Sequence, residues 1–485
     1  MSVQLIIILL YFIITITIGL LSARRTKSAD SFSGASLSVF AIVCASAGEW
    51  LGGTATTGVS KYGFNYGISG AWYTIANGIG VMFLAIFFAR MFRSLNTGTV
   101  PGIIEKFFGA HARTVSSVAL TIVMLAVGLS QMIAAGKLGQ SLLGIDFKIS
   151  CCVFAVIFIV YTLAGGMNAV ASTNTMHLFI MYFGVIMGGI LALHMAGGWS
   201  EFKSGIEALD SQTQGGGFLN MFSIGTSKVS SWIIASLLGA CTAQAGLQPV
   251  LSSRNTHEAR KACVITALVA APFGLFTAFL GMTARVMSEN GTLLDTAGNL
   301  VTDGKLALPT LMMNMNPIAG GIILASILAA VLSTASPIIL AAGTMLTRDI
   351  YQNIIDPQAD DIKILRVSRL TTAFSGVICC VGAILLVDAS AILDLVYAAY
   401  SLRGAVFIVV LLGILWRRAS EKGACIAIIL TAVVAVGWVA WDLVFGSYPI
   451  VIGGFAVSET YAAVVTAFVS TIVFSLIFPK QEKTI

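Results

Sequence analysis

The sequence has few charged side chains. Asp, Glu, Lys and Arg make up 10% of its 485 residues, whereas 57% of the residues are hydrophobic. A soluble chain would carry about 25% of these four residue types. The missing charge, with a mean hydropathy of +0.94, predicts an integral membrane protein. The net charge of +6 comes without a Lys/Arg cluster interleaved with aromatics, so we expect no nucleic-acid partner.

The sequence also lacks the motifs of nucleotide- or cofactor-dependent chemistry. It has no GxxxxGK[ST] phosphate loop, and its eight cysteines show no CxxC or Cys/His pairing. We therefore expect no enzyme activity and no cofactor, and we interpret the cysteines as small buried hydrophobic residues. The longest polar stretches are the loops 198–228 and 287–316. A membrane sensor with an output domain is therefore disfavoured, and no obligate protein partner is evident.

Hydrophobic runs of bilayer-spanning length, about 20 residues each, recur along the whole chain. The first run is longer than a signal-peptide core and has no basic segment before it, which predicts a retained span. The sequence therefore predicts one polytopic all-α membrane domain over residues 1–485. Its thirteen predicted transmembrane helices are 3–22, 38–58, 69–92, 114–136, 149–166, 171–197, 229–250, 263–285, 317–346, 369–388, 391–416, 423–445 and 459–478.

The basic residues predict the orientation. With the N-terminus outside and the C-terminus in the cytoplasm, the inner segments hold most of the 27 Lys and Arg residues. This distribution follows the positive-inside rule and predicts a multi-pass protein of the cell membrane. The basic residues of these inner segments are Arg24, Arg25, Lys27, Arg90, Arg93, Lys106, Arg113, Arg254, Arg260, Lys261, Arg348, Lys363, Arg366, Arg369, Arg417, Arg418, Lys422, Lys480 and Lys483.

Two of the predicted spans carry helix-breaking residues. CASAGEWLGGTATTG lies in span 38–58, and LLGACTAQAGLQPVL lies in span 229–250. Glycine and proline weaken a helix, and the exposed backbone is tolerated at membrane depth only beside a cavity or ligand. Close helix packing is the alternative explanation for these glycines. Glu49 and Gln244 lie among them, and packing alone would not need these polar side chains.

Each broken span opens a set of five helices, and because five is odd the second set must be inverted. We predict a first repeat over 38–197 and a second over 229–416, with flanking helices 3–22, 423–445 and 459–478. This five-plus-five inverted repeat, with a broken first helix in each half, is typical of secondary transporters.

Span 317–346 contains a polar face. Ala330, Ser333 and Thr334 follow the i, i+3, i+4 spacing, and Pro337 cannot donate to the carbonyl of Ser333. Neutral oxygens suit a monovalent cation better than a divalent one, which would need carboxylates. Hydrogen bonds to the helix's own backbone are the alternative role for these hydroxyls.

At these motifs the sequence resembles the sodium:solute symporter family. The resemblance rests on GEWLGGTATTGVSKYGFNYGISGAWY, TLAGGMNAVASTNTMHLFIM, GACTAQAGLQPVLSSRNTHEARKA and AAVLSTASPIILAAGTMLTRDIYQ, in this order. It implies the fold of the amino-acid transporter LeuT and sodium-driven uptake. It also implies a sodium site made by the carbonyls of Gly48, Leu51 and Ala330 and the hydroxyls of Ser333 and Thr334.

The sequence departs from the family at several positions. Asn174 and Pro337 stand where members with a second sodium site have an aspartate and a serine, so we expect one sodium ion per cycle. Glu49 and Arg403 stand where relatives tend to be neutral. We expect these two residues to pair or to bind the solute, and the alternative places Arg403 near a helix end, reaching toward the outer face.

The residues around the two breaks are the predicted solute site: Glu49, Trp50, Thr54, Gln244 and Arg403. The aromatic residues Trp72, Tyr73, Tyr397 and Tyr400 could add to it. We therefore expect import of a small polar organic solute with sodium by alternating access, with the bilayer as the other partner. Two alternatives remain open: proton coupling through Glu49, and a membrane sensor or channel.

Overall fold

The computed structural model describes residues 3–34, 36–143, 145–212, 217–295, 298–386, 392–445, 449–452 and 455–480. Ten helices in this part of the chain are long and apolar enough to cross a membrane, which confirms the all-α membrane class. A short antiparallel hairpin of β1 (Val451–Ile452) and β2 (Phe455–Ala456) precedes the last helix.

The first half of the chain begins with a single span and continues with a broken helix. Its elements are α1 (Val3–Ser22), the turn Ala23–Arg25, α2 (Ala29–Ser33), α3 (Val39–Trp50), the π-helical segment Thr54–Gly58, α4 (Val59–Tyr66), the 3-10 turn Gly67–Ala71, α5 (Trp72–Phe83), the π-helical segment Leu84–Phe88, α6 (Ala89–Ser94), α7 (Val100–Phe108), α8 (Ala110–Leu143) and α9 (Phe147–Met195).

The second half repeats the plan with a second broken helix, α11 and α12. Its elements are α10 (Trp199–Gln212), α11 (Thr226–Gly239), α12 (Gln244–Leu251), α13 (Thr256–Ala270), α14 (Phe273–Glu289), α15 (Gly304–Met313), α16 (Pro317–Met345), the π-helical segment Leu346–Ile355, α17 (Asp361–Leu386), α18 (Ile392–Leu415), α19 (Glu421–Phe445) and α20 (Glu459–Ile477).

Length and hydropathy alone identify ten candidate spans among the described residues, whereas we predicted thirteen. Helix α9 counts once because it runs over 49 residues, although Gly166 inside it has a non-helical φ of 53°. The two predicted spans 149–166 and 171–197 meet at this glycine. Helix α3 and the stretch Ala399–Leu415 of α18 are apolar but shorter than the spanning length. The count of thirteen therefore stays a prediction.

Four helices lie in segments that we predicted as loops: α2, α7, α10 and α15. Three of their starts are locally encoded. At the start of α2 the Ser28 side chain accepts from the N–H of Ser31. The Thr99 side chain accepts from the Gly102 N–H at the start of α7, and Asp303 accepts from Lys305 at the start of α15. Apolar runs of spanning length do not reveal these helices, because the helices are too short to contain such a run.

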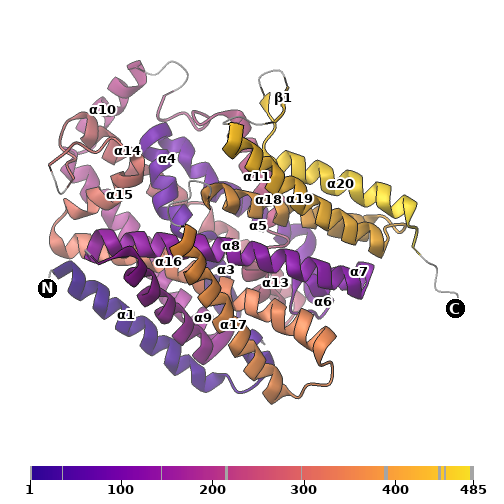
Figure 1. The fold of residues 1–485 in the computed structure, drawn as a ribbon. Coiled ribbons are helices and arrows are strands. Elements are labelled where there is room, and N and C mark those ends of the chain that lie inside the picture. Colours follow the sequence, from indigo (N-terminus) through magenta and orange to yellow (C-terminus); the bar gives the residue numbers. More distant parts are fainter. Residues whose placement is uncertain are drawn as a thin grey trace.

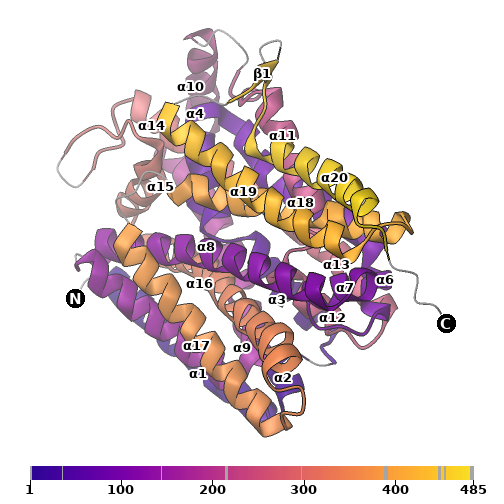
Figure 2. The ribbon, with the colours of Figure 1, turned by 45° about the vertical axis from the view of Figure 1, so that its right-hand side comes forward.

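Helix α16 forms the centre of the molecule. In its apolar stretch 94% of the residues are buried, and it packs against α9, α8, α17 and α1. In Figures 1 and 2, α1, α9 and α17 lie on one side of α8, and α18, α19 and α20 lie on the other. Helix α3 packs against α9 and α16 and against α12 and α13, and Glu49 near its broken end contacts Arg403 of α18.

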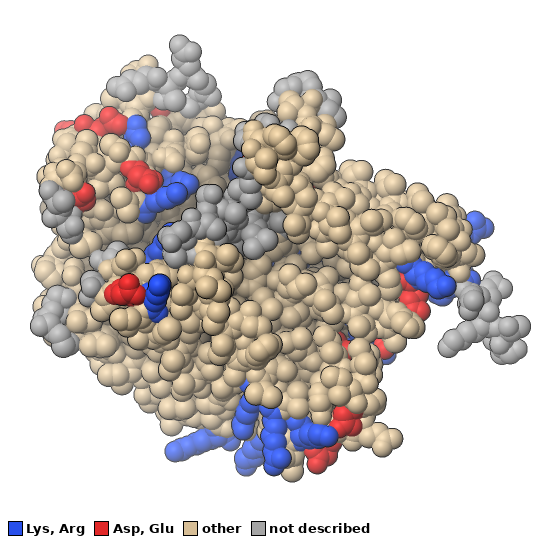
Figure 3. Space-filling model, viewed as in Figure 1, with Lys and Arg blue, Asp and Glu red and all other residues tan. Residues whose placement is uncertain are grey.

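Basic side chains gather at one end of the molecule. Figure 3 shows Lys and Arg concentrated at the lower end, to which α1 descends and from which α17 rises in Figure 1. At this end Arg348 pairs with Asp30 at 2.5 Å, and the N–H of Ala29 donates to Asp361. The segments after α1, after α16 and before α17 thus meet on one side, as the predicted topology requires.

Candidate functional site

The first break lies between α3 and the segment Thr54–Gly58. The N–H of Leu51 closes the last turn of α3, and that of Gly53 instead donates to Gln131 on α8. Gly48 allows a close approach here: a Cβ on it would lie 2.3 Å from the carbonyl oxygen of Ser333. Glycine is therefore needed for the end of α3 to reach α16.

One face of this break holds the predicted sodium residues. The Thr334 hydroxyl donates to the carbonyl of Gly48 at 2.5 Å, and the Ser333 hydroxyl donates to that of Ala330 at 2.9 Å. Both hydroxyls are almost fully buried, and Leu51 is completely buried. The structure thus brings four of the five residues into direct contact, and it places the fifth on the adjoining turn.

Asn174 lies directly beside this group of oxygens. Its Nδ2 donates to the carbonyl of Ser333 at 3.0 Å and lies 3.4 Å from that of Ala45. Its Oδ1 is buried and meets no hydrogen-bond partner among the described residues. An amide N–H therefore lies between these two backbone carbonyls.

The other face of the break carries a buried ion pair. Arg403 on α18 contacts Glu49 on α3 at 2.7 Å, and the side chains are 5% and 2% exposed. The guanidinium lies over the rings of Trp50 and Tyr400, 5.4 and 4.8 Å from the ring centroids. The predicted pairing is confirmed, and the alternative of a cation reaching the outer face is wrong.

The second break, Ala240–Ala243, is held by hydrogen bonds to other helices. Thr242 donates to the carbonyl of Arg403 at 2.5 Å. The side-chain oxygen of Gln244 accepts from the N–H of Val100 at 2.7 Å, and its Nε2 donates to the carbonyl of Gly98. Gln244 therefore holds the segment before α7.

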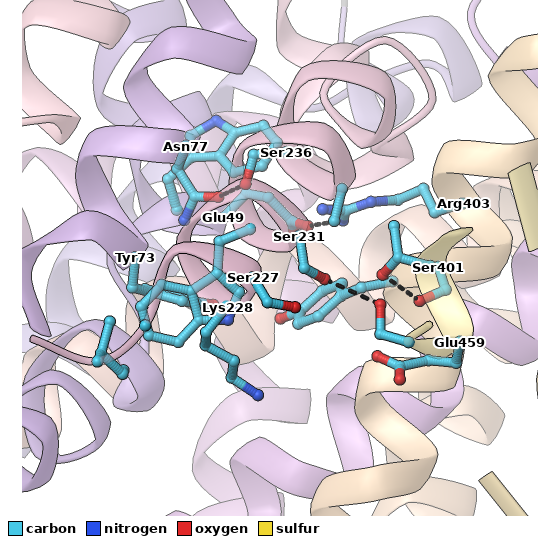
Figure 4. Close-up of a pocket in the computed structure, with 18 residues that line it drawn as sticks. Glu49, Tyr73, Asn77, Ser227, Lys228, Ser231, Ser236, Ser401, Arg403 and Glu459 are labelled. Atoms are coloured by element: carbon cyan, nitrogen blue, oxygen red, sulfur yellow. Dashed lines mark hydrogen bonds and ion pairs between the residues drawn. The ribbon is translucent and has the colours of Figure 1, made fainter. Parts of the chain in front are cut away.

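A cavity of about 260 Å³ opens beside the ion pair. It lies between the end of α3, α5, α11, α18 and the start of α20 (Figure 4). Of the predicted solute residues Glu49, Trp50 and Arg403 line it, whereas Thr54 and Gln244 are not among its lining residues. The Gln244 amide turns instead toward the segment before α7, a direction that its position beside a break does not reveal.

Aromatic and small polar side chains complete this cavity. Tyr73 and Tyr400 line it as expected, and the side chain of Tyr397 lies outside the described part of the structure. The Trp232 ring stands edge-on to Tyr73, with centroids 5.9 Å apart. Sequence reasoning missed Trp232 and Asn77 because an apolar helix does not show which face meets a cavity.

A larger cavity of about 710 Å³ lies at the basic end. Behind it Asp349 is fully buried and accepts hydrogen bonds from Thr99 and from Arg113, each at 2.8 Å. Arg113 also pairs with Glu105. This charged network ties α7 and α8 to the end of α16. An acidic residue just after an apolar helix was the available sequence signal, and it was not used.

Two half-molecules with broken first helices, and a polar site at the first break, define a secondary transporter. The family profile described as the sodium:solute symporter family matches residues 32–431. The chain belongs to this family, and it is a sodium-coupled solute symporter. The comparisons give no support to proton coupling or to a sensor or channel.

Two curated relatives match most of the chain. The sodium/glucose cotransporter of Vibrio parahaemolyticus is 23% identical over 87% of this chain and 82% of its own length. The high-affinity proline transporter PutP of Bacillus subtilis (strain 168) is 25% identical over 87% and 89%.

Two solved structures share the fold. A Na+-coupled sialic acid symporter in a substrate-bound outward-open state has a TM-score of 0.82 at 18% identity, covering 99% of both chains. The nucleobase-cation-symport-1 family transporter Mhp1 has a TM-score of 0.57 at 13% identity, covering 93% of this chain and 94% of its own. These likenesses establish the LeuT-like architecture.

Proposed function

We propose that this symporter imports a small polar organic solute together with one sodium ion, by alternating access. The sodium ion would be held by the carbonyls of Gly48, Leu51 and Ala330 and the hydroxyls of Ser333 and Thr334. The observation that carries the proposal is the direct contact between Thr334 of α16 and the carbonyl of Gly48 at the end of α3. Uncharged oxygens converge there from two helices.

The two faces of the first break supply the coupling. Gly48 and Leu51 would contribute carbonyls to the ion, while Glu49 and Trp50, directly between them in the chain, line the cavity. An ion that fixes the backbone of this turn also fixes the two side chains that it carries. A ligand shifts a conformational equilibrium only through different affinities for its states, and a site shared by α3 and α16 provides that difference if these helices move apart.

The orientation follows from the basic end. We place the N-terminus outside and the C-terminus in the cytoplasm of a cell membrane, so that the 260 Å³ cavity faces outward and the 710 Å³ cavity inward. We expect no covalent chemistry, and the repeat bounds 38–197 and 229–416 remain part of this proposal. The relatives are named for different solutes, so the solute must be inferred from this chain's own cavity.

Sodium binding can be tested without knowing the solute. Purified protein should be more stable to heat in NaCl than in KCl of equal concentration, because a ligand that binds the folded state stabilises it. Replacing Ser333 and Thr334 together by Ala should abolish this difference. Ser326→Ala is the matched control, because Ser326 is a buried serine of the same helix whose hydroxyl donates to the carbonyl of Ile323 within α16. A sodium effect retained in the double variant would overturn the assignment.

A further inference from the structure

The outer cavity contains buried polar atoms that the protein leaves unused. Glu49 Oε2, Arg403 Nε, Trp50 Nε1 and Trp232 Nε1 have no hydrogen-bond partner within the described structure. All four residues line the same cavity, and each is at least nine-tenths buried. Buried polar groups are nearly always hydrogen-bonded, so a cluster of exceptions calls for an absent partner. The cluster offers one charged acceptor, one charged donor and two indole donors.

The ion pair is built so that both partners keep a free position. Glu49 and Arg403 share only the contact between Oε1 and Nη1, which leaves Oε2 and Nε available. The central carbon of the guanidinium lies 5.4 Å from the ring centroid of Trp50 and 4.8 Å from that of Tyr400, so two aromatic rings border the cation. Gly239 lies beside Nε, and a Cβ on it would be 3.3 Å from this nitrogen. Any larger residue at this position would therefore crowd Nε.

The charges around the cavity balance. Glu49 and Glu459 are matched by Lys228 and Arg403 among the lining residues. A simple anion would face the carboxylate of Glu49, and a simple cation would face Arg403. A ligand that carries both charges meets an opposite charge at each end. Hydrogen bonds between charged groups are roughly twice as strong as neutral ones, so a polyol would fill the same positions less favourably.

We propose that the solute is a small zwitterion of the α-amino-acid class. Its ammonium group binds Glu49 Oε2, and its carboxylate binds Arg403 Nε together with an indole N–H. The rings of Tyr73 and Trp232 border the space left for the side chain. This assignment rests on the proposed symport function and specifies which solutes it serves.

A binding screen on the full-length wild-type protein tests the class. The probes are the twenty amino acids and glycine betaine, the corresponding carboxylic acids without the amino group, the corresponding amines without the carboxyl group, and a set of sugars and polyols. Thermal stability is measured with each probe in NaCl and in KCl. Stabilisation should be confined to zwitterions. If sugars, acids or amines stabilise the protein while no zwitterion does, or if no probe stabilises it, the proposal is wrong.

Two variants separate recognition from structural support. Glu49→Gln removes the ammonium partner. The ratio of affinities for the stabilising amino acid and its deaminated acid should therefore fall by at least about tenfold, because one charge-assisted hydrogen bond is lost. Arg403→Gln should lower the preference over the decarboxylated amine in the same way. If both variants keep the wild-type preference, the pair is structural only and the proposal is wrong.

The screen also distinguishes this proposal from the symport function beneath it. If a zwitterion stabilises the protein equally in NaCl and in KCl, the zwitterion assignment is supported and sodium coupling is contradicted. If sugars stabilise the protein more in NaCl than in KCl and zwitterions do not stabilise it, sodium coupling is supported and the zwitterion assignment is wrong.

Discussion

The two broken helices share an interruption but use it differently. At the first break, Gly48 meets Thr334 of α16 on one face, and Glu49 meets Arg403 of α18 on the other, with polar atoms left without partners. At the second break, the side chains of Thr242 and Gln244 form hydrogen bonds with backbone groups of α18 and of the start of α7. The first break therefore has the chemistry of a ligand site, and the second has that of a structural joint.

This difference gives the second break a mechanical role. Thr242 donates a hydrogen bond to the carbonyl of Arg403 on α18, and Gln244 accepts one from the N–H of Val100 at the start of α7. The joint thus links α18 to a segment that borders the cavity at the basic end.

The largest expected effect comes from the ion pair of the first break. Glu49→Gln should leave Arg403 as an uncompensated buried cation and lower the free energy of unfolding by about 3–5 kcal/mol. Adding Arg403→Met should recover part of this loss, while uptake stays low because the solute groups are gone. Chemical or thermal unfolding in detergent, measured as a double-mutant cycle, gives the coupling between the two sites. Strictly additive losses would show that the pair contributes nothing.

A smaller effect is expected at the joint. Gln244→Ala leaves the N–H of Val100 buried without an acceptor, which should cost about 1–3 kcal/mol of unfolding free energy. Gln358→Ala is the matched control because Gln358 is exposed, and it should change little. Heat-unfolding midpoints of the two variants in the same detergent make the comparison. Equal midpoints would remove Gln244 from the joint.

Thr242→Val should have a milder effect still. The substitution keeps the side-chain volume but removes the hydrogen bond to the carbonyl of Arg403, for which about 0.5–1.5 kcal/mol is expected. If the joint transmits motion, the uptake rate should fall by more than this stability loss explains, while sodium affinity stays unchanged. Uptake and sodium titrations on the same preparation would show this. If the variant has wild-type uptake, Thr242 has only a structural role and does not transmit motion.

The number of sodium ions transported per solute molecule tests the first break in the wild-type protein, without a substitution. Asn174 stands where members with a second sodium site have an aspartate, and its neutral amide donates to the carbonyl of Ser333. We expect one sodium ion per solute molecule, which reversal-potential measurements on proteoliposomes can determine. A ratio of two would mean that ligands elsewhere replace the aspartate and the serine.

Sequence reasoning predicted the architecture and part of the site. Hydrophobic length located the spans, and clustered glycines located both breaks, because these signals act along the chain. The contact between Thr334 and Gly48 agrees with the family motif. That the Gln244 amide contacts Val100 and does not line the cavity could not be predicted, because the direction of a side chain depends on its tertiary neighbours. Asp349 and Trp232 were missed for the same reason: their partners, Arg113 and Tyr73, lie far away in the sequence.

The central claim is that a single break serves both the ion and the solute. Trp50 reports on it directly, because it lies between Gly48 and Leu51 and lines the solute cavity. We predict that NaCl, but not KCl, changes the tryptophan fluorescence of the wild-type protein, and that the change disappears in Trp50→Phe and when Ser333 and Thr334 are both replaced by Ala. A sodium response that persists in Trp50→Phe, or in the variant without the two hydroxyls, would contradict the claim.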